Sequence, residues 1–228
     1  MTTLAGIRAK LDEAPHHIFH ASLPLYILLE KRPRPDNHDW VEVGCWKQGN
    51  AEGMMVYLSL IDAMIDLYGR NRNGGRYRIF PFEAIDPRAF IDGHGGWFTV
   101  YLVYGFAARG NRLLLNERGE PMSMTHATHF QITPDMADHF HLQFGDKMVA
   151  WLERLHDKAG MPDYGRIVDE LAVASSDELN RHAGEALQRI ERPDAGRDNI
   201  THCGLYDPIE QCWRYVAFAD LAHCSECA

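Results

Sequence analysis

Apolar residues recur every three or four positions between Leu60 and Tyr68, which predicts an amphipathic helix. Ser59 precedes this run as an N-cap, and Asp62 follows three residues later in the capping-box position. The segment Asn71–Gly75 reads Asn-Arg-Asn-Gly-Gly, which is a clear stop signal. Both ends of this helix are therefore predicted from local sequence alone.

The same periodicity and the same end signals predict the other helices. One begins at a capping Asp146 and closes at Gly160. A longer helical stretch over Arg166–Ile190 restarts at Ser175 or Ser176. Shorter helices are expected over Thr3–Pro15 and over Asp86–Ile91.

Alternating or continuously apolar runs predict the strands. Trp97–Tyr104 is β-branched and aromatic almost throughout, which is typical of a central strand buried on both faces. His139–Phe144 alternates polar and apolar positions and is expected to pair with a strand over His129–Thr133. The remaining predicted strands are Leu25–Leu29, Trp40–Val43, Met54–Leu58, Arg76–Phe82, Arg112–Asn116 and a last hairpin of Leu205–Tyr206 with Cys212–Phe218.

The order of these elements predicts an α+β fold. We expect a mostly antiparallel sheet with helices packed on one side, followed by a C-terminal helical stretch and a hairpin. Strands cluster in the middle and long helices come later, unlike the regular alternation of a doubly wound parallel sheet. The 228 residues are expected to form one domain, 1–228, in which 1–145 is rich in sheet and 146–228 holds the helices and the hairpin.

Composition and charge narrow the range of partners. Hydrophobic residues make up 46% of the chain, enough for a packed core. The net charge of −9 repels phosphate backbones and anionic lipid, so nucleic acid and membrane are not expected partners. No apolar run is long enough to span a bilayer and no secretory signal is present, which favours a cytoplasmic location. A negative surface suits a basic protein partner, although many proteins are acidic only for solubility.

The C-terminal cysteines form the strongest local pattern for chemistry. Cys224 and Cys227 have the two-residue gap of a zinc knuckle, and His223 stands beside them. Cys203 and Cys212 would complete the donor set, although they are nine residues apart around a turn. A zinc site at Cys203, Cys212, His223, Cys224 and Cys227 is one interpretation. In the other, Cys203 and Cys212 face each other across the hairpin as free thiols or a disulfide.

A histidine pair offers a second possible metal site. His139 and His141 alternate on one predicted strand, so they project from the same face. Two histidines with one carboxylate can hold a catalytic metal that keeps an open position. The nearest following acid, Asp146, stands at a helix cap and is badly placed for this role. A solvated strand face is the simpler interpretation.

Two other motifs are explained by structure more simply than by catalysis. Asp62 and Asp66 share a helix face like paired catalytic carboxylates, but Arg70 four residues further on favours a surface ion-pair ladder. The run Asp92–Trp97 is similar to the glycine-rich oxyanion loop of lipases and esterases. The sequence lacks the Gly-x-Ser-x-Gly nucleophile that such enzymes need, so a tight turn is expected.

The tryptophans divide between core and surface in the sequence-based prediction. Trp97 and Trp151 lie in strongly apolar patterns and are expected in the core. Trp40 and Trp46 flank a strand beside the charged loop 31–39, and are the candidates for a contact surface.

No stretch carries a catalytic or cofactor signature, so the favoured function is binding rather than catalysis. We expect a bacterial interaction protein that binds and occludes a protein partner, as immunity proteins do when they neutralise toxins. This hypothesis predicts an acidic or aromatic patch and no organised polar pocket. The alternative is a metal-dependent enzyme or a zinc-stabilised regulatory domain that uses His139 and His141 or the C-terminal cysteines and histidine.

Overall fold

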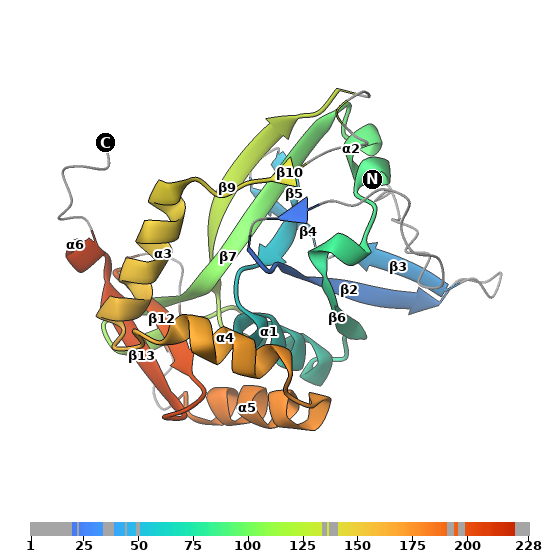
Figure 1. Cartoon of the computed structure of the whole chain (residues 1–228). Coiled ribbons are helices and arrows are strands. Elements are labelled where there is room, and N and C mark those ends of the chain that lie inside the picture. The colour runs from blue at the N-terminus through green and yellow to red at the C-terminus, as the bar shows by residue number, and fades with distance from the viewer. Residues whose placement is uncertain are drawn as a thin grey trace.

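The computed structural model describes residues 20–21, 23–33, 39–43, 45–48, 51–133, 136, 141–190, 194–195 and 199–221 (Figure 1). The helix predicted at Thr3–Pro15 lies outside these residues. The helical elements are α1 (Leu60–Arg72), the 3-10 turn η1 (Phe82–Ala84), α2 (Arg88–Gly93), α3 (Asp146–Lys158), α4 (Tyr164–Ala172), α5 (Ser176–Gln188) and α6 (Phe218–Leu221). The strands are β1 (His20–Ala21), β2 (Tyr26–Pro33), β3 (Asp39–Val43), β4 (Cys45–Gln48), β5 (Ala51–Tyr57), β6 (Tyr77–Pro81), β7 (Trp97–Arg109), β8 (Arg112–Leu115), β9 (Ser123–Gln131), β10 (His141–Leu142), β11 (Asp194–Ala195), β12 (His202–Asp207) and β13 (Cys212–Ala217).

A mixed sheet with helices packed alongside it makes the core, which confirms the predicted α+β class. Most of its ladders are antiparallel, among them β7 with β9, β2 with β6 and β12 with β13. The parallel exception at the centre is β5 with β7, where Met54 lies opposite Val100. The predicted pairing of His129–Thr133 with His139–Phe144 is wrong. Strand β9 pairs with β7 instead, because β7 is long enough to pair with several strands. Strand β10 pairs in parallel with β1.

Strand β7 organises the sheet. It is buried over most of its 13 residues, as its apolar sequence predicts, and it also pairs with β12. A bulge separates Val103 from Phe106, and Gly105 within it has a φ of 142°. A Cβ atom at this glycine would lie 2.6 Å from the Cys203 sulfur, so only glycine lets β12 approach. Trp97, predicted in the core, is 51% exposed because it is the first residue of the strand and follows a surface turn.

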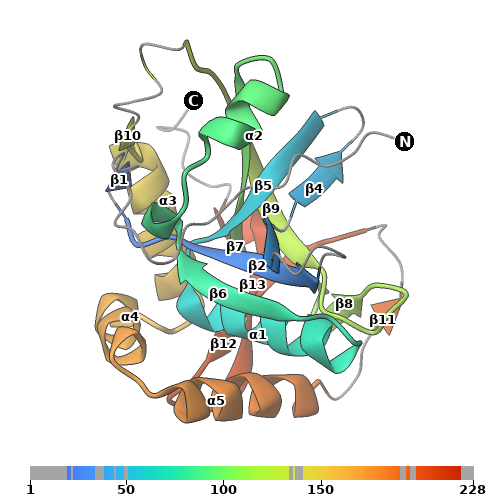
Figure 2. The same ribbon diagram turned by 90° about the vertical axis from the view of Figure 1, so that its right-hand side faces the viewer.

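Helix α1 is covered on two sides. Ser59 is its N-cap, as predicted, and accepts a hydrogen bond from the Asp62 amide at 3.4 Å. The Asp62 carboxylate does not bond back to the Ser59 amide, so the predicted capping box is only half formed. Figure 2 shows α1 between β6 and α5. Asp62 and Asp66 are therefore only 2% and 4% exposed, and the predicted surface ladder is wrong. The ion pair itself exists in a buried setting: Arg70 Nε donates to Asp66 Oδ1 at 2.9 Å, and the Tyr57 hydroxyl donates to Asp66 Oδ2.

The C-terminal part follows its predicted order. Helix α5 begins after Ser175, which forms a full capping box with Glu178. Helix α3 begins at Asp146, and Gly145 rather than Asp146 is its N-cap residue. The β12–β13 hairpin packs on α5, where Trp213 Nε1 donates to the Ala186 carbonyl at 2.9 Å. Within the described ranges, no helix combines the length and apolar character needed to cross a membrane.

Candidate functional site

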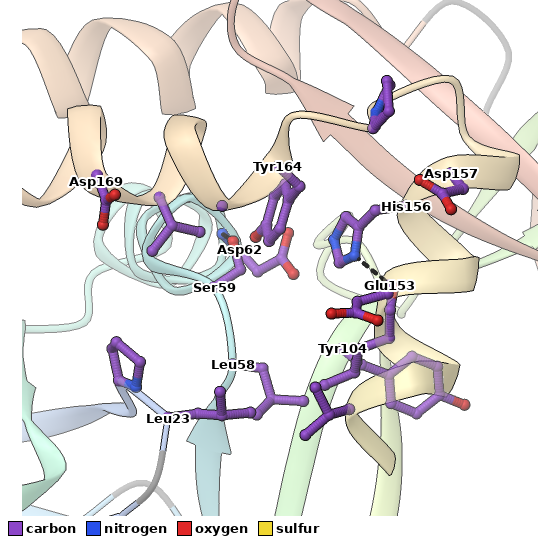
Figure 3. Close-up of a pocket in the computed structure, with 16 residues that line it drawn as sticks. Leu23, Leu58, Ser59, Asp62, Tyr104, Glu153, His156, Asp157, Tyr164 and Asp169 are labelled. Carbon is purple, nitrogen blue, oxygen red and sulfur yellow. Dashed lines mark hydrogen bonds between the residues drawn. The ribbon is translucent and has the colours of Figure 1, made fainter. Parts of the chain in front are cut away.

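A cavity of about 570 Å³ lies among α1, α3 and α4, with β7 at its side. Figure 3 shows Ser59, Asp62, His156 and Tyr164 at one end of it and the apolar Leu23 and Leu58 at the other. The rest of its wall is largely apolar, with a few acids. These residues are Pro24, Val149, Leu152, Pro162, Gly165 and Val168, with Tyr104, Glu153, Asp157 and Asp169.

Asp62 is the most unusual group in this cavity. It stands in the first turn of α1 and is 2% exposed, yet it lines the open space. Among the described residues, no group donates a hydrogen bond to its carboxyl oxygens. Burial alone raises its pKa from 3.8 to about 7, because the charged form loses hydration without gaining a partner. The carboxyl can therefore gain or lose a proton near neutral pH.

Ser59 and Tyr164 lie beside Asp62. The Ser59 hydroxyl oxygen caps α1, and its side chain lies near the Tyr164 hydroxyl. Burial first, and the neighbouring Asp62 second, raise the pKa of Tyr164 far above its usual range. The phenol therefore stays protonated, and this group supplies the cavity with a neutral hydroxyl.

His156 closes the same end of the cavity from α3. Its ring stacks on Tyr164 with centroids 3.6 Å apart, and its Nδ1 lies 2.8 Å from the Leu152 carbonyl oxygen. Nδ1 must carry the proton, since a carbonyl can only accept, and Nε2 is then an acceptor. Burial lowers the pKa of His156 to about 4, so the ring is neutral at physiological pH.

The electrostatic character of the cavity is negative. Three acids, Glu153, Asp157 and Asp169, are exposed at its rim, in addition to the buried Asp62. Among the described residues that line it there is no lysine or arginine. Acceptors outnumber donors, so the arrangement favours a ligand that brings hydrogen-bond donors and positive charge.

The cavity lacks the geometry of a serine nucleophile site. Activation of Ser59 would need a base in hydrogen-bond contact with its hydroxyl. The Ser59 hydroxyl oxygen instead accepts a hydrogen bond from the Asp62 amide. In the described structure no hydrogen bond joins Ser59 to His156, whose Nδ1 is held by Leu152. The group of residues is better suited to binding than to acyl transfer.

The predicted zinc donors are not gathered in the described part of the chain. The hairpin register places Cys203 opposite Val216 and Cys212 opposite Asp207, so the prediction that the two cysteines face each other is wrong. The four-residue turn after Asp207 sets this register. Cys203 is fully buried, and burial and Asp62 raise the pKa of its thiol, which disfavours the thiolate that zinc needs.

The other proposed donors are not tested. His223, Cys224 and Cys227 lie outside the described residues, and the zinc hypothesis stays a prediction for them. No group of three histidine, cysteine or acidic side chains placed to hold a metal occurs among the residues described. His139 is also outside the described ranges, whereas His141 is exposed on β10.

The predicted contact surface at Trp40 and Trp46 also stays a prediction. Trp40 belongs to β3 and Trp46 to β4, where it lies opposite Gly53 of β5. Their side chains fall outside the described part of the structure. Trp151, predicted in the core, is half-buried and packs edge-on against Tyr104, with ring centroids 5.0 Å apart.

No sequence pattern predicted this cavity. From the sequence, Ser59 is predicted only as a helix cap and Asp62 only as part of a surface ion pair. His156 and Tyr164 belong to no recognisable motif. One signal was present: α4 and α5 each have an apolar stripe that must be buried against another helix. The face of α1 that carries Asp62 and Asp66 was predicted to be exposed and is buried instead.

Comparison of the chain with protein-family models, with curated proteins and with solved structures gives no match. Its function is therefore inferred from the geometry of the cavity.

Proposed function

We propose that this protein binds a small organic cation, an amine with an apolar body, in the cavity beside Asp62. One observation carries the proposal: a buried carboxyl lines a cavity and accepts no hydrogen bond from the described residues. The Asp62 oxygens are not among the fully buried polar atoms that lack a partner, so they remain accessible from the cavity, where a ligand can reach them. An ammonium group supplies both the missing donor and the opposite charge.

The surroundings of Asp62 favour a cation over a neutral donor. The rim carries acids and the described lining has no lysine or arginine, so a positive ligand is attracted before it makes contact. His156 is neutral and offers Nε2 as a second acceptor. The rings of Tyr104 and Tyr164 line the same space and can stabilise a cation by their faces.

The size and lining of the cavity support a small-molecule ligand. A volume of about 570 Å³ falls within the range of roughly 300–1,000 Å³ that is typical of ligand pockets. Such pockets combine apolar walls with a few convergent polar groups, as here. The apolar end at Leu23 and Leu58 would contact the body of the ligand.

Calorimetric titration at pH 8 with benzylamine and its neutral counterpart benzyl alcohol tests the proposal. We expect benzylamine to bind at least about tenfold more tightly, because a charge-assisted hydrogen bond replaces a neutral one. Asp62→Asn should lose about tenfold or more in affinity for the amine. Asp169→Asn removes the same charge from the exposed rim and should change the affinity by less than about threefold. Equal binding of benzylamine by wild type and Asp62→Asn would contradict the proposal.

Binding of a basic protein partner is the second candidate function, as the sequence suggests for a cytoplasmic bacterial immunity protein. The observation that favours it is Val173, which is 86% exposed between α4 and α5. Exposed acids precede and follow it in sequence, at Asp169, Glu170 and Asp177. An apolar anchor among acids suits a partner whose contact surface is basic.

Affinity capture from the native host at low and high salt tests this second function. A basic protein should be retained at low salt and weakened at high salt, since screening reduces attraction between exposed charges. Val173→Asp should lose this protein, while Ile209→Asp, at a turn remote in sequence, should retain it. Retention of the same protein by Val173→Asp would exclude this surface.

A further inference from the structure

A second cavity, of about 340 Å³, lies on the other flank of α3. Leu58, Tyr104 and Leu152 line both cavities, so the two spaces meet at these three side chains. Figure 1 shows α3 beside β7 and β9, with α6 along one flank and α4 beyond its C-terminal end. The walls unique to the second cavity include Leu102, His126, Met148, Trp151 and Leu221.

The two cavities differ in charge. Of the described residues, Lys147 and Arg154 line the second cavity without any aspartate or glutamate, whereas acids line the first without any lysine or arginine. Helix α3 supplies charges to both. Lys147 and Arg154 are seven residues apart and so share one flank, while Glu153 and Asp157 are four apart and share the other. The two neighbouring cavities therefore present an acidic end, three shared apolar or aromatic side chains between them, and a basic end.

From this contrast we propose that the ligand is an elongated zwitterion. Its ammonium group lies at Asp62, its apolar middle crosses Leu58, Tyr104 and Leu152, and its carboxylate lies near Lys147 and Arg154. The inference rests on the proposed function, because the ammonium end occupies the cation site described above. The inference adds a carboxylate to the ligand and a fixed separation between this carboxylate and the ammonium group.

The helix geometry sets the length of this ligand. Lys147 and His156 are nine residues apart on α3, or about 13 Å along its axis at 1.5 Å per residue, and Arg154 lies closer to His156. A ligand whose carboxylate reaches the Lys147 end of α3 therefore needs a separation of about 10–13 Å between ammonium and carboxylate, and one that reaches only Arg154 needs less. Medium-chain ω-amino acids have this chemistry, and so do apolar peptides of three or four residues, which extend about 3.3–3.6 Å per residue.

Titration of the full chain at pH 8 with ω-aminoundecanoate, undecylamine and undecanoate, each below its micelle concentration, tests the inference. We expect ω-aminoundecanoate to bind at least about fivefold more tightly than undecylamine, and undecanoate to bind more weakly than both. The double variant Lys147→Gln/Arg154→Gln should remove the advantage of the zwitterion and leave the affinity for undecylamine unchanged within about twofold. Lys158→Gln, on the same helix but lining neither cavity, is the matched control and should keep the wild-type preference.

The outcomes separate this inference from the proposed function. If undecylamine binds as tightly as ω-aminoundecanoate, the basic end has no role and the zwitterion is overturned, while the cation site stands. If benzylamine binds but neither long ligand does, the cavities are not joined and the inference also fails. If no amine binds, both proposals fail. Trileucine is also titrated as a zwitterionic peptide. If it binds more tightly than ω-aminoundecanoate, and the double variant loses this affinity, the zwitterion is supported and the ligand is a peptide.

Discussion

At the residue scale, Asp62 couples folding to pH. Its pKa is raised from 3.8 to about 7 by burial, so the folded state holds a proton that the unfolded chain has already released between these values. Below about pH 4 the carboxyl is neutral in both states and has no electrostatic cost. As pH rises from about 4 to 7, the unfolded chain ionises first and stability falls. Above about 7 both states are ionised and the loss is complete.

Asp62→Asn should therefore stabilise the free protein at high pH. The pKa difference corresponds to at most about 4 kcal/mol in the free energy of unfolding at pH 8, at 1.36 kcal/mol per pKa unit, and to nearly nothing at pH 4. The unpaired amide will offset part of this gain. Urea unfolding of both proteins at the two pH values measures it, with Asp169→Asn as the control for an exposed acid. An equal effect of Asp62→Asn at both pH values would show that Asp62 is not the coupled group.

At the element scale, the start of α5 depends on one side chain. Ser175 accepts a hydrogen bond from the Glu178 amide, and the Glu178 carboxylate bonds back to Ser175. Ser175→Ala should lower the free energy of unfolding by about 1 kcal/mol, the usual cost of losing an N-cap. Ser176→Ala, one residue inside the helix, should change it by less than about 0.5 kcal/mol. Urea denaturation measures both, and similar losses would argue against the cap.

Helix α3 is the least firmly held element beside the site. Leu155 is its one buried residue, and cavities lie on both of its flanks. Its backbone amides should therefore exchange hydrogen faster than those of α1, which is buried on two sides. Binding of ω-aminoundecanoate should slow exchange in α3 by about tenfold or more and leave α5 unchanged. Hydrogen exchange followed by mass spectrometry measures this, and uniform slowing over the whole chain would contradict a local effect.

At the scale of the whole molecule, ligand, proton and folding are linked. A ligand that binds only the folded state adds about 2.7 kcal/mol of stability at a concentration one hundred times its Kd. For a chain of 228 residues this raises Tm by about 5–10 °C. The increment with benzylamine should be larger at pH 8 than at pH 6, since Asp62 has a pKa of about 7 and must lose its proton to bind a cation.

Thermal unfolding at the two pH values tests this linkage. In Asp62→Asn the dependence of the ligand-induced shift on pH should disappear, because no titrating carboxyl remains at the site. A wild-type increment that is larger at pH 6 than at pH 8 would mean that the amine binds without loss of the Asp62 proton, which would contradict the proposed ion pair.

Helices and strands that are marked by caps, turns or strand preferences within a few residues could be predicted from the sequence. Ser59 and Asn71–Gly75 set the ends of α1, Ser175 began α5, and the apolar run from Trp97 predicted β7, because caps, turns and strand preferences act within a few residues. These signals, with the order of the elements, were sufficient for the α+β class.

Which side chains are buried, and which of them contact one another, depends on tertiary packing. An isolated helix would expose Asp62 to water, and α4 and α5, about one hundred residues later, remove it. Trp97, the first residue of β7, is 51% exposed for the opposite reason, since the end of the strand is less covered than its middle. His156 and Tyr164 reach Asp62 through contacts between distant elements, and burial depends on those contacts rather than on neighbours in sequence.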